Sequence, residues 1–421
     1  MARYIVEKSG PLHGEVTVSG AKNAVLPIMA ASLLCEEPCI IDEAPALKDV
    51  EIMCMLGKAL GAQVEEDIDK NMVIIKAETL DSHTAPVNLV KKMRASILVM
   101  GPLLARTGKA IIPLPGGCAI GDRPVELHFK GLSALGANIS VSTAGIVTAT
   151  AEKLVGSNIY LDFPSVGATE NIIMAASLAE GTTILENAAQ EPEIVDLANF
   201  LNKMGARIKG AGTDTIKVEG VGRLHGAKHS VIPDRIEAGT FMVAAAISRG
   251  VIHIKNVLPD HVKPITAKLR ECGVEISTTD EGMIVKADSE ILTSTDIKTL
   301  PYPGFPTDMQ SIFMAFLTTV GGTSAVIETV FENRYMHVAE LKRMGAAIKT
   351  DDRCAIIEGM ASLKGAKVVA TDLRAGAAVV LAGLVARGKT EVSDIYHIER
   401  GYEKFVEKIS GLGGKIRLER D

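Results

Sequence analysis

One short phrase occurs six times along the chain, and its spacing restricts the fold to a repeat architecture. Each copy is a residue with an apolar side chain, then a glycine, with a β-branched residue three positions after the glycine. The six glycines are Gly61, Gly136, Gly205, Gly273, Gly345 and Gly413. A glycine directly after an amphipathic helix is a common C-terminal cap, so each copy predicts the end of a helix and the start of a strand. The chain is therefore predicted to contain six units of roughly 70 residues.

A second phrase alternates with the first and predicts a further helix and strand in each unit. It is a helix of small residues, usually followed by a glycine and then by an alternating strand. Its copies end at Cys35 (without the glycine), Gly108, Gly181, Gly250, Gly321 (a looser copy) and Gly388. Each unit then consists of two strand–helix segments and a hairpin. Strands that alternate with helices predict an α/β fold in which helices cover sheets.

The sixth unit lacks one hairpin strand, and the N-terminus resembles the missing strand. Residues 216–226 and 356–365 share a pattern with residues 4–14, but only the first two segments follow another strand. The sixth unit stops after its first hairpin strand, at residues 414–418. The N-terminal strand is therefore expected to complete the last hairpin.

The chain is expected to form two domains, because 421 residues are enough for two hydrophobic cores. Glycines and polar residues concentrate between Gly220 and Pro233, which places the boundary there. We expect one discontinuous domain of residues 1–21 and 230–421, with repeats 4–6. The other domain spans residues 22–229, with repeats 1–3.

Composition excludes several classes of function. An apolar content of 47% and a charged content of 23% are typical of a globular protein. A net charge of -6 gives no basic excess for binding nucleic acid. The sequence has no signal peptide and no apolar run that could span a bilayer, so we expect a cytoplasmic protein without a membrane partner. The six cysteines form no C-x-x-C pair and the nine histidines show no metal-ligand spacing, so we expect reduced thiols and no metal.

Residues 113–128 form the most unusual loop of the sequence. Two prolines and a Gly-Gly pair exclude a helix or a strand at its centre. Cys118 in this loop, with Arg123 five residues later, is either a reactive thiol or a free cysteine of an ordinary surface loop. A reactive thiol would be favoured by nearby cations, and the glycines would let the loop close over a site.

Basic residues occupy the starts of several small-residue helices. Lys22, Arg94 and Arg374 fall in a first turn, where a cation opposes the helix dipole. This placement predicts binding of phosphates or carboxylates at helix N-termini, and solvated surface charges are the alternative. Arg123 and Arg400 are further candidates for anion binding, or else surface salt-bridge residues.

Acidic and hydroxyl residues at the same helix starts are expected to be caps. Ser165, Asp234 and Asp372 stand where an N-cap is needed. Asp308, which follows Pro-Thr, is also expected to be a simple N-cap, with a catalytic base as the alternative.

Seven motifs make the sequence resemble the enolpyruvyl transferases over essentially its whole length. They are Ser19-Gly-Ala-Lys-Asn23, Met93-Arg-Ala-Ser96, Pro115-Gly-Gly-Cys-Ala-Ile-Gly-Asp-Arg-Pro-Val125, Ser165-Val-Gly-Ala-Thr169, Phe305-Pro-Thr-Asp308, Phe331-Glu-Asn-Arg334 and Thr371-Asp-Leu-Arg374. The resemblance implies a two-domain, inverse α/β barrel-like fold of six repeats. It also implies transfer of the enolpyruvyl group of phosphoenolpyruvate to the 3′-hydroxyl of UDP-N-acetylglucosamine, by addition and then elimination of phosphate. This reaction needs no cofactor and is the first committed step of peptidoglycan synthesis.

The resemblance also implies roles for individual residues. Cys118 would be the acid and would attach covalently to phosphoenolpyruvate, as the thiol that fosfomycin targets in this family. Asp308 would be the base, and Lys22 and Arg400 would be catalytic cations. The residues implied for phosphoenolpyruvate binding are Lys22, Asn23, Cys118, Arg123, Arg374 and Arg400.

A second set is implied for the UDP-sugar. Its members are Asn23, Arg94, Arg123, Pro124, Val125, Glu126, Leu127, Ser165, Val166, Gly167, Asp308 and Val330. The sequence departs from some family members at one place, because Phe163 stands where they carry a lysine. One charge toward the nucleotide is therefore missing.

Two other functions compete with this one. The shikimate-pathway enolpyruvyl transferase shares the fold, but it has a Gly-Ser-Lys-Ser motif in the first repeat and lacks the loop cysteine. Lys22-Asn23 and Cys118 argue against it. A catalytically inactive, regulatory paralogue would have lost Cys118, Asp308 or Lys22, and all three are present.

Overall fold

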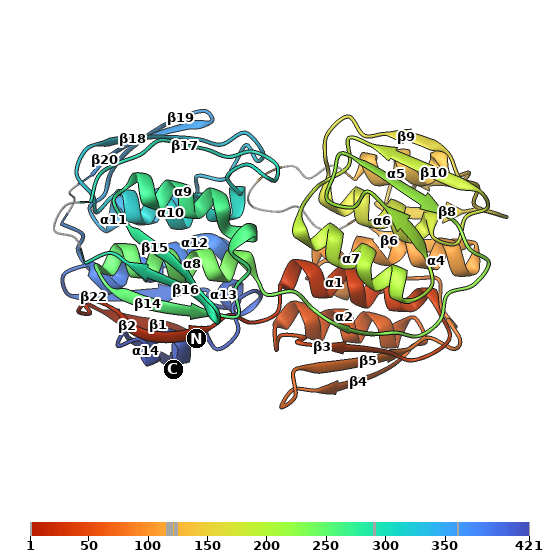
Figure 1. Ribbon diagram of the computed structural model, residues 1–421, viewed down its shortest axis with the longest axis horizontal. Coiled ribbons are helices and arrows are strands. Elements are labelled where there is room, and N and C mark those ends of the chain that lie inside the picture. The colour runs from red at the N-terminus through yellow and green to blue at the C-terminus, as the bar shows by residue number, and fades with distance from the viewer. Residues whose placement is uncertain (1, 115–120, 122–124, 289–291, 360–361, 421) are drawn as a thin grey trace. The chain divides into compact units, whose positions relative to one another are not determined.

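The computed structural model divides the chain into two compact units (Figure 1). We name them the discontinuous unit, which contains both ends of the chain, and the continuous unit. The residues that the structure describes are 2–19, 121, 233–288, 292–359 and 362–420 in the discontinuous unit, and 20–114 and 125–232 in the continuous unit.

The continuous unit contains three small sheets built on one plan. In each sheet, one strand pairs antiparallel with a strand of a hairpin on one side. On its other side it pairs parallel with a further segment. In the second sheet, the bridge from Thr84 to Ile111 takes the place of the parallel strand. The sheets are β13 (Lys228–Ser230), β3 (Cys39–Asp42), β5 (Met72–Lys76) and β4 (Gln63–Asp67); β6 (Lys109–Pro113), β8 (Ile146–Thr150) and β7 (Asn138–Val141); and β9 (Asn158–Tyr160), β10 (Thr182–Glu186), β12 (Thr215–Glu219) and β11 (Arg207–Lys209).

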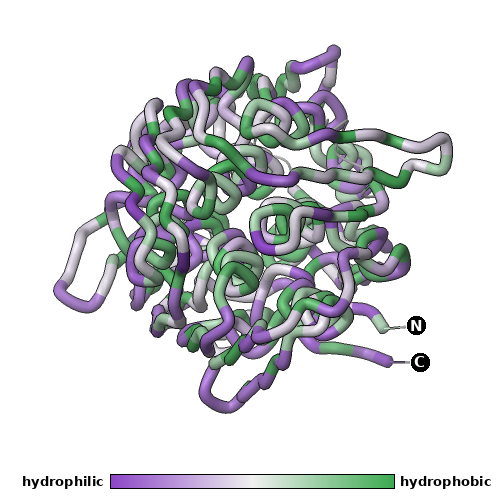
Figure 2. Tube along the Cα trace, turned by 90° about the vertical axis from the view of Figure 1, so that its right-hand side faces the viewer, coloured by the Kyte–Doolittle hydropathy of each residue, from purple (hydrophilic) through white to green (hydrophobic). Residues whose placement is uncertain are grey.

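The discontinuous unit repeats this plan three times. Its sheets are β2 (His13–Thr17), β14 (Val251–Lys255), β16 (Gly282–Lys286) and β15 (Glu275–Thr279); β17 (Ile297–Lys298), β18 (Thr323–Ile327), β20 (Cys354–Glu358) and β19 (Ala347–Asp351); and β21 (Lys367–Val369), β22 (Lys389–Ser393), β1 (Ala2–Glu7) and β23 (Lys415–Arg420). In the last sheet, β1 pairs antiparallel with β23, with Tyr4 opposite Leu418. The N-terminal strand thus fills the hairpin position that the sixth unit lacks, and the two termini lie side by side (Figure 2).

Helices form the interior of each unit, and the sheets lie outside them. The inner helices are buried on nearly all sides, as expected of helices that are apolar all round. In the continuous unit they are α1 (Lys22–Ala31), η2 (Arg94–Val99) with α4 (Met100–Thr107), and α6 (Val166–Ala176); in the discontinuous unit they are α8 (Arg235–Ser248), η4 (Thr307–Met309) with α10 (Gln310–Leu317), and α12 (Leu373–Val385). The hydrophilic tips of several hairpin loops lie at the periphery (Figure 2).

A second set of helices ends at the six repeated glycines. These helices are α2 (Lys48–Ala59), α5 (Glu126–Ala134), α7 (Pro192–Lys203), α9 (Lys263–Glu271), α11 (His337–Arg343) and α14 (Phe405–Gly411). Four shorter helical elements of the described residues lie outside both sets: η1 (Ser32–Leu34), α3 (Val87–Val90), η3 (Pro259–Val262) and α13 (Tyr396–Glu399). All six glycines have a positive φ, from 90° to 107°. After Gly61, for example, the N–H of Ala62 returns to the carbonyl of Gly57 at 3.0 Å. The predicted C-terminal caps are confirmed.

Two further features of the described residues bear on function. None of their helices is long and apolar enough to cross a membrane, and they contain no cluster of three or more metal-ligating side chains. Cys35, Cys39, Cys54 and Cys272 are buried free thiols, whereas Cys354 is half-buried.

The end of α14 offers a test of the repeated cap. Gly413 has a φ of 90°, and no heavy atom lies within 4 Å of the place that a Cβ would take, so Gly413→Ala adds backbone strain without a clash. We expect the free energy of unfolding to fall by about 1–2 kcal/mol in urea denaturation. Gly411→Ala is the matched control, since Gly411 is helical and equally open. A control that loses as much stability would contradict the capping role.

Candidate active site

The predicted site residues fall into three groups. Cys118, Arg123 and Pro124 lie outside the described residues. The other predicted residues of the continuous unit are Lys22, Asn23, Arg94, Val125, Glu126, Leu127, Ser165, Val166 and Gly167, and those of the discontinuous unit are Asp308, Val330, Arg374 and Arg400.

Lys22 is the first residue of α1 and is nearly buried. Its Nζ lies 2.6 Å from Oδ2 of Asp49 in the first turn of α2, and the two side chains are 11% and 2% exposed. Because an ammonium group at a helix N-terminus opposes the dipole, Asp49 supplies the opposite charge that keeps it there. Asp49 was not predicted, since an acidic residue in a first turn is an ordinary feature of helices. Asn23 follows Lys22 and is half-buried.

Asn171 joins the starts of three helices in the continuous unit. Its Oδ1 accepts a hydrogen bond from the N–H of Gly101 in α4 at 2.7 Å. Its Nδ2 donates to the carbonyl of Ile97 in η2 and to Nδ1 of His128 in α5, each at 2.9 Å. The segments that begin with Arg94, Val125 and Val166 are therefore held together.

Several predicted UDP-sugar residues of this unit lie near His128. A Cβ atom at Gly167 would stand 3.2 Å from Cε1 of His128, so the start of α6 packs closely on α5. Ser165 is the N-cap of α6, and its Oγ accepts a hydrogen bond from the N–H of Ala168 at 3.4 Å, as predicted. The structure thus brings Arg94 together with two further predicted segments, 125–127 and 165–167. Phe163, the position that departs from the family, is 42% exposed.

Asp308 is not the N-cap that the sequence predicts. It lies in η4, whose cap position is Pro306, and its carboxylate contacts two arginines instead. Nη2 of Arg334 donates to Oδ1 at 2.7 Å, and Nη2 of Arg374 donates to Oδ2 at 3.2 Å. The arginine side chains are 3% and 2% exposed, whereas that of Asp308 is 27% exposed. A partly exposed carboxylate is therefore held between two buried guanidinium groups, an arrangement that fixes its orientation. The predicted caps Asp234 and Asp372 are confirmed.

Arg374 is also held by Tyr402. Its guanidinium lies over the Tyr402 ring, 5.3 Å from the ring centroid, and the Tyr402 hydroxyl contacts Oγ1 of Thr240 at 2.8 Å. Burial opposes the charge of Arg374, but attraction by Tyr402 and Asp308 outweighs it and raises the pKa of Arg374. Arg400 ends α13, two residues before Tyr402, and is half-buried. Of the cations predicted in this unit, Arg374 therefore contacts both Tyr402 and Asp308.

Two site features were missed or given no role. Arg334 belongs to a motif that the sequence singles out, but nothing in the pattern predicts its contact with Asp308. Ser19 is not a cap of α1, whose N-cap is Ala21. The Oγ of Ser19 instead donates to Glu403 at 2.6 Å and accepts from Nζ of Lys408 at 2.7 Å.

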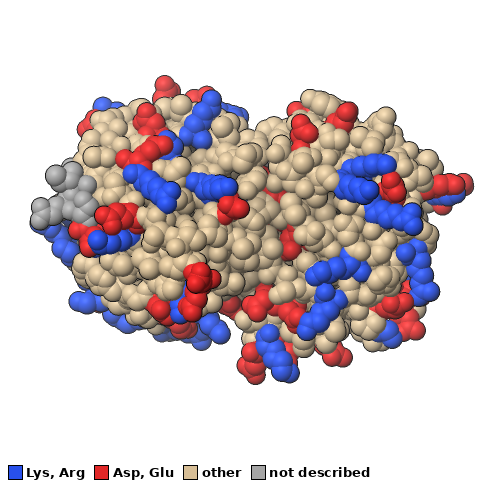
Figure 3. Space-filling model, in the orientation of Figure 1, with Lys and Arg blue, Asp and Glu red and all other residues tan. Residues whose placement is uncertain are grey.

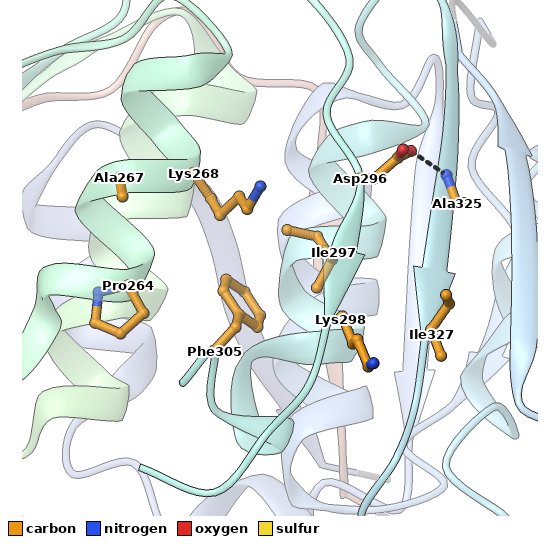
Figure 4. Close-up of a pocket in the computed structure, with 9 residues that line it drawn as sticks. All are labelled: Pro264, Ala267, Lys268, Asp296, Ile297, Lys298, Phe305, Ala325 and Ile327. Carbon is orange, nitrogen blue, oxygen red and sulfur yellow. Dashed lines mark hydrogen bonds between the residues drawn. The ribbon is translucent and has the colours of Figure 1, made fainter. Parts of the chain in front are cut away.

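A separate pocket of about 370 Å³ lies between α9 and the strands β17 and β18 (Figure 4). Phe305, three residues before Asp308, forms part of its wall, and Asp296 accepts a hydrogen bond from the N–H of Ala325 at 2.8 Å. None of the predicted site residues that the structure describes lines it. On the face shown in Figure 3, acidic and basic side chains are interspersed, which agrees with recognition of anions by local groups of cations.

The environment of His128 predicts a dependence of stability on pH. Burial, and next the charge of Arg94, lowers the pKa of His128 to about 3. Because an unfolded histidine binds a proton near pH 6.5, the unfolded chain binds more protons than the folded one between these values. We expect the free energy of unfolding to fall by about 1–2 kcal/mol between pH 7 and pH 5 on account of this residue.

Urea denaturation of His128→Gln at both pH values tests this expectation. The variant should lose that part of the pH dependence, while a control at an exposed histidine, His13→Gln, should keep it. Equal pH dependence in both variants would show that His128 does not remain neutral in the folded protein.

The chain is similar to known proteins over nearly its full length. Residues 6–409 match the family described as EPSP synthase (3-phosphoshikimate 1-carboxyvinyltransferase). UDP-N-acetylglucosamine 1-carboxyvinyltransferase 1 of Caldanaerobacter subterraneus subsp. tengcongensis is 61% identical over 414 residues, which cover 98% of this chain and 99% of that protein. UDP-N-acetylglucosamine 1-carboxyvinyltransferase 2 of Carboxydothermus hydrogenoformans is 57% identical over 422 residues and the full length of both chains.

A solved structure confirms the predicted fold. The enolpyruvyl transferase NikO from Streptomyces tendae superposes with a TM-score of 0.90 at 24% identity, over 99% of this chain and 98% of that one. The inverse α/β barrel-like fold of six repeats is therefore correct.

Proposed function

Because this chain belongs to the UDP-N-acetylglucosamine 1-carboxyvinyltransferases of the enolpyruvyl transferase family, we propose that it carries out their reaction through the residues described above. The enolpyruvyl group of phosphoenolpyruvate moves to the 3′-hydroxyl of UDP-N-acetylglucosamine, and phosphate is released. This step commits the sugar to peptidoglycan synthesis in the cytoplasm. The observation that supports the proposal best is the carboxylate of Asp308, which is partly exposed and is fixed by two buried arginines.

Asp308 acts in the addition step. The sugar oxygen bonds to C2 of phosphoenolpyruvate while C3 takes a proton, which gives a tetrahedral ketal. The hydroxyl proton passes to the partly exposed carboxylate of Asp308. Arg334 and Arg374 hold the carboxylate in place during this transfer.

The cations bind the anionic substrate and stabilise the leaving phosphate. Lys22, Arg374 and Arg400 supply positive charge for the phosphate and carboxylate of phosphoenolpyruvate, and Asn23 supplies an amide. In the elimination step C3 loses a proton, the C2–O bond to phosphate breaks, and the enolpyruvyl double bond forms. The ion pair with Asp49 orients the Lys22 ammonium.

Cys118 supplies the proton that C3 takes in the addition step. This role, and the phosphoenolpyruvate contact of Arg123, come from the family's motif, since both residues lie outside the described part of the chain. The UDP-sugar lies against Arg94, the segments 125–127 and 165–167, and Val330.

Phosphate release from phosphoenolpyruvate, with two acceptors compared, tests the proposal. UDP-N-acetylglucosamine should support release and shikimate 3-phosphate should not. Cys118→Ser and Asp308→Asn should each lower kcat by at least about 100-fold, because each removes a group that transfers a proton.

Matched controls keep the result specific. Cys354→Ser alters a half-buried thiol of β20, and Asp351→Asn alters an exposed carboxylate at the end of β19; both should keep wild-type rates. Release with shikimate 3-phosphate would favour the EPSP synthase reaction. If phosphate is released with neither acceptor although the UDP-sugar binds, the protein would instead be interpreted as the inactive, regulatory paralogue.

A further inference from the structure

We propose that Glu328 is a positioning residue for the UDP-sugar, and that it orders the two segments of the discontinuous unit that carry Asp308 and Val330. The inference rests on the proposed function, because it concerns the same site. Glu328 directly follows β18 and is completely buried, with 0% of its surface exposed. It belongs to none of the motifs that predicted the site.

One carboxylate oxygen of Glu328 holds the segment that contains Val330. Oε1 accepts hydrogen bonds from the N–H groups of Val330 at 2.8 Å and Phe331 at 3.1 Å. It also accepts one from Oγ1 of Thr299 at 2.8 Å. Three donors on one oxygen fix the backbone of this segment where it leaves the strand, and so fix the place of the Val330 side chain.

The other oxygen reaches the segment that contains Asp308. Oε2 accepts a hydrogen bond from Oγ1 of Thr307 at 2.8 Å. Oγ1 of Thr307 accepts in turn from Nη1 of Arg334 at 3.2 Å, and Nη2 of Arg334 donates to Asp308 at 2.7 Å. A continuous chain of hydrogen bonds therefore runs from Glu328 through Thr307 and Arg334 to the carboxylate of Asp308.

The chemistry of the network requires a carboxylate at this position. Four donors face the two oxygens of Glu328, and a carboxylate consists of acceptors only. Among the described residues, no lysine, arginine or histidine forms an ion pair with it, so its burial is compensated entirely by these neutral donors. Burial of a charge is unfavourable because the charge loses its hydration. An apolar side chain of the same size would fill the same space without this loss. The arrangement is therefore explained by orientation of the two segments rather than by stability.

Glu328→Gln is the direct test. The amide would present an NH2 group to Thr307. The Thr307 hydroxyl could then no longer donate to residue 328 and would have to accept from it, in addition to the bond that it accepts from Arg334. We expect the KM for UDP-N-acetylglucosamine to rise about 10-fold, the loss typical of one hydrogen bond to a charged group. The KM for phosphoenolpyruvate should stay unchanged, because the cations assigned to that substrate are held by other partners, Asp49 for Lys22 and Tyr402 for Arg374. Glu358→Gln, at an exposed glutamate at the end of β20, is the control and should match the wild type.

Thr307→Val provides a second variant that removes the relay without disturbing the buried carboxylate's other three donors. It should raise the KM for the UDP-sugar in the same way, and the double variant Glu328→Gln/Thr307→Val should be no worse than the more affected single one. The affinities for UDP-N-acetylglucosamine measured by calorimetry should rank the wild type and the variants in the same order as their KM values for this substrate.

Two results would overturn the inference. One is an unchanged KM for the UDP-sugar in both variants; the other is an equal rise in both KM values together with a lower melting temperature, which would indicate a structural role alone. Failure of the proposed function gives a different result, since the wild-type protein would then neither bind nor convert the UDP-sugar.

Discussion

Burial of the inner helices on nearly all sides determines where polar chemistry can lie in this protein. A helix that packs against apolar neighbours along its whole length leaves polar groups room only at its ends. The residues at the starts of these helices include Lys22 on α1, Asp308 before α10 and Arg374 on α12. The architecture therefore places several charged site residues at helix N-termini, where free N–H groups already favour anions.

Those charges are kept in place by partners that come from elsewhere in the chain. Asp49 pairs with Lys22, the Tyr402 ring packs against Arg374, and Arg334 reaches Asp308 from the loop after β18. A cation in a first turn is unfavourable alone, and a buried guanidinium is more so. Each unfavourable placement is thus offset by a specific neighbour, and together these neighbours orient the groups that contact substrate.

Much of the fold follows from local sequence patterns. The six C-terminal cap glycines can be predicted from the sequence, because few residues other than glycine adopt a positive φ. The strand that completes the sixth hairpin can also be predicted, because the sequence pattern of β1 matches that of the other hairpin strands. The site is less accessible to such reasoning. Asp308 looks like an N-cap, since Pro-Thr-Asp is a typical helix start; its true partners, Arg334 and Arg374, lie 26 and 66 residues away. Glu328 likewise has no local signature, because its four donors come from three separate segments.

The proposed mechanism requires that the Asp308 carboxylate receive the 3′-hydroxyl of the sugar. Calorimetric binding of UDP-N-acetylglucosamine and of its 3-deoxy analogue, to the wild-type protein and to a folded Asp308→Ala variant, measures this contact. In the wild type the analogue should bind more weakly by about 1.5–3 kcal/mol, the contribution of a hydrogen bond to a charged group. In the variant the two ligands should bind equally. A difference of the same size in both proteins would show that another residue receives the hydroxyl.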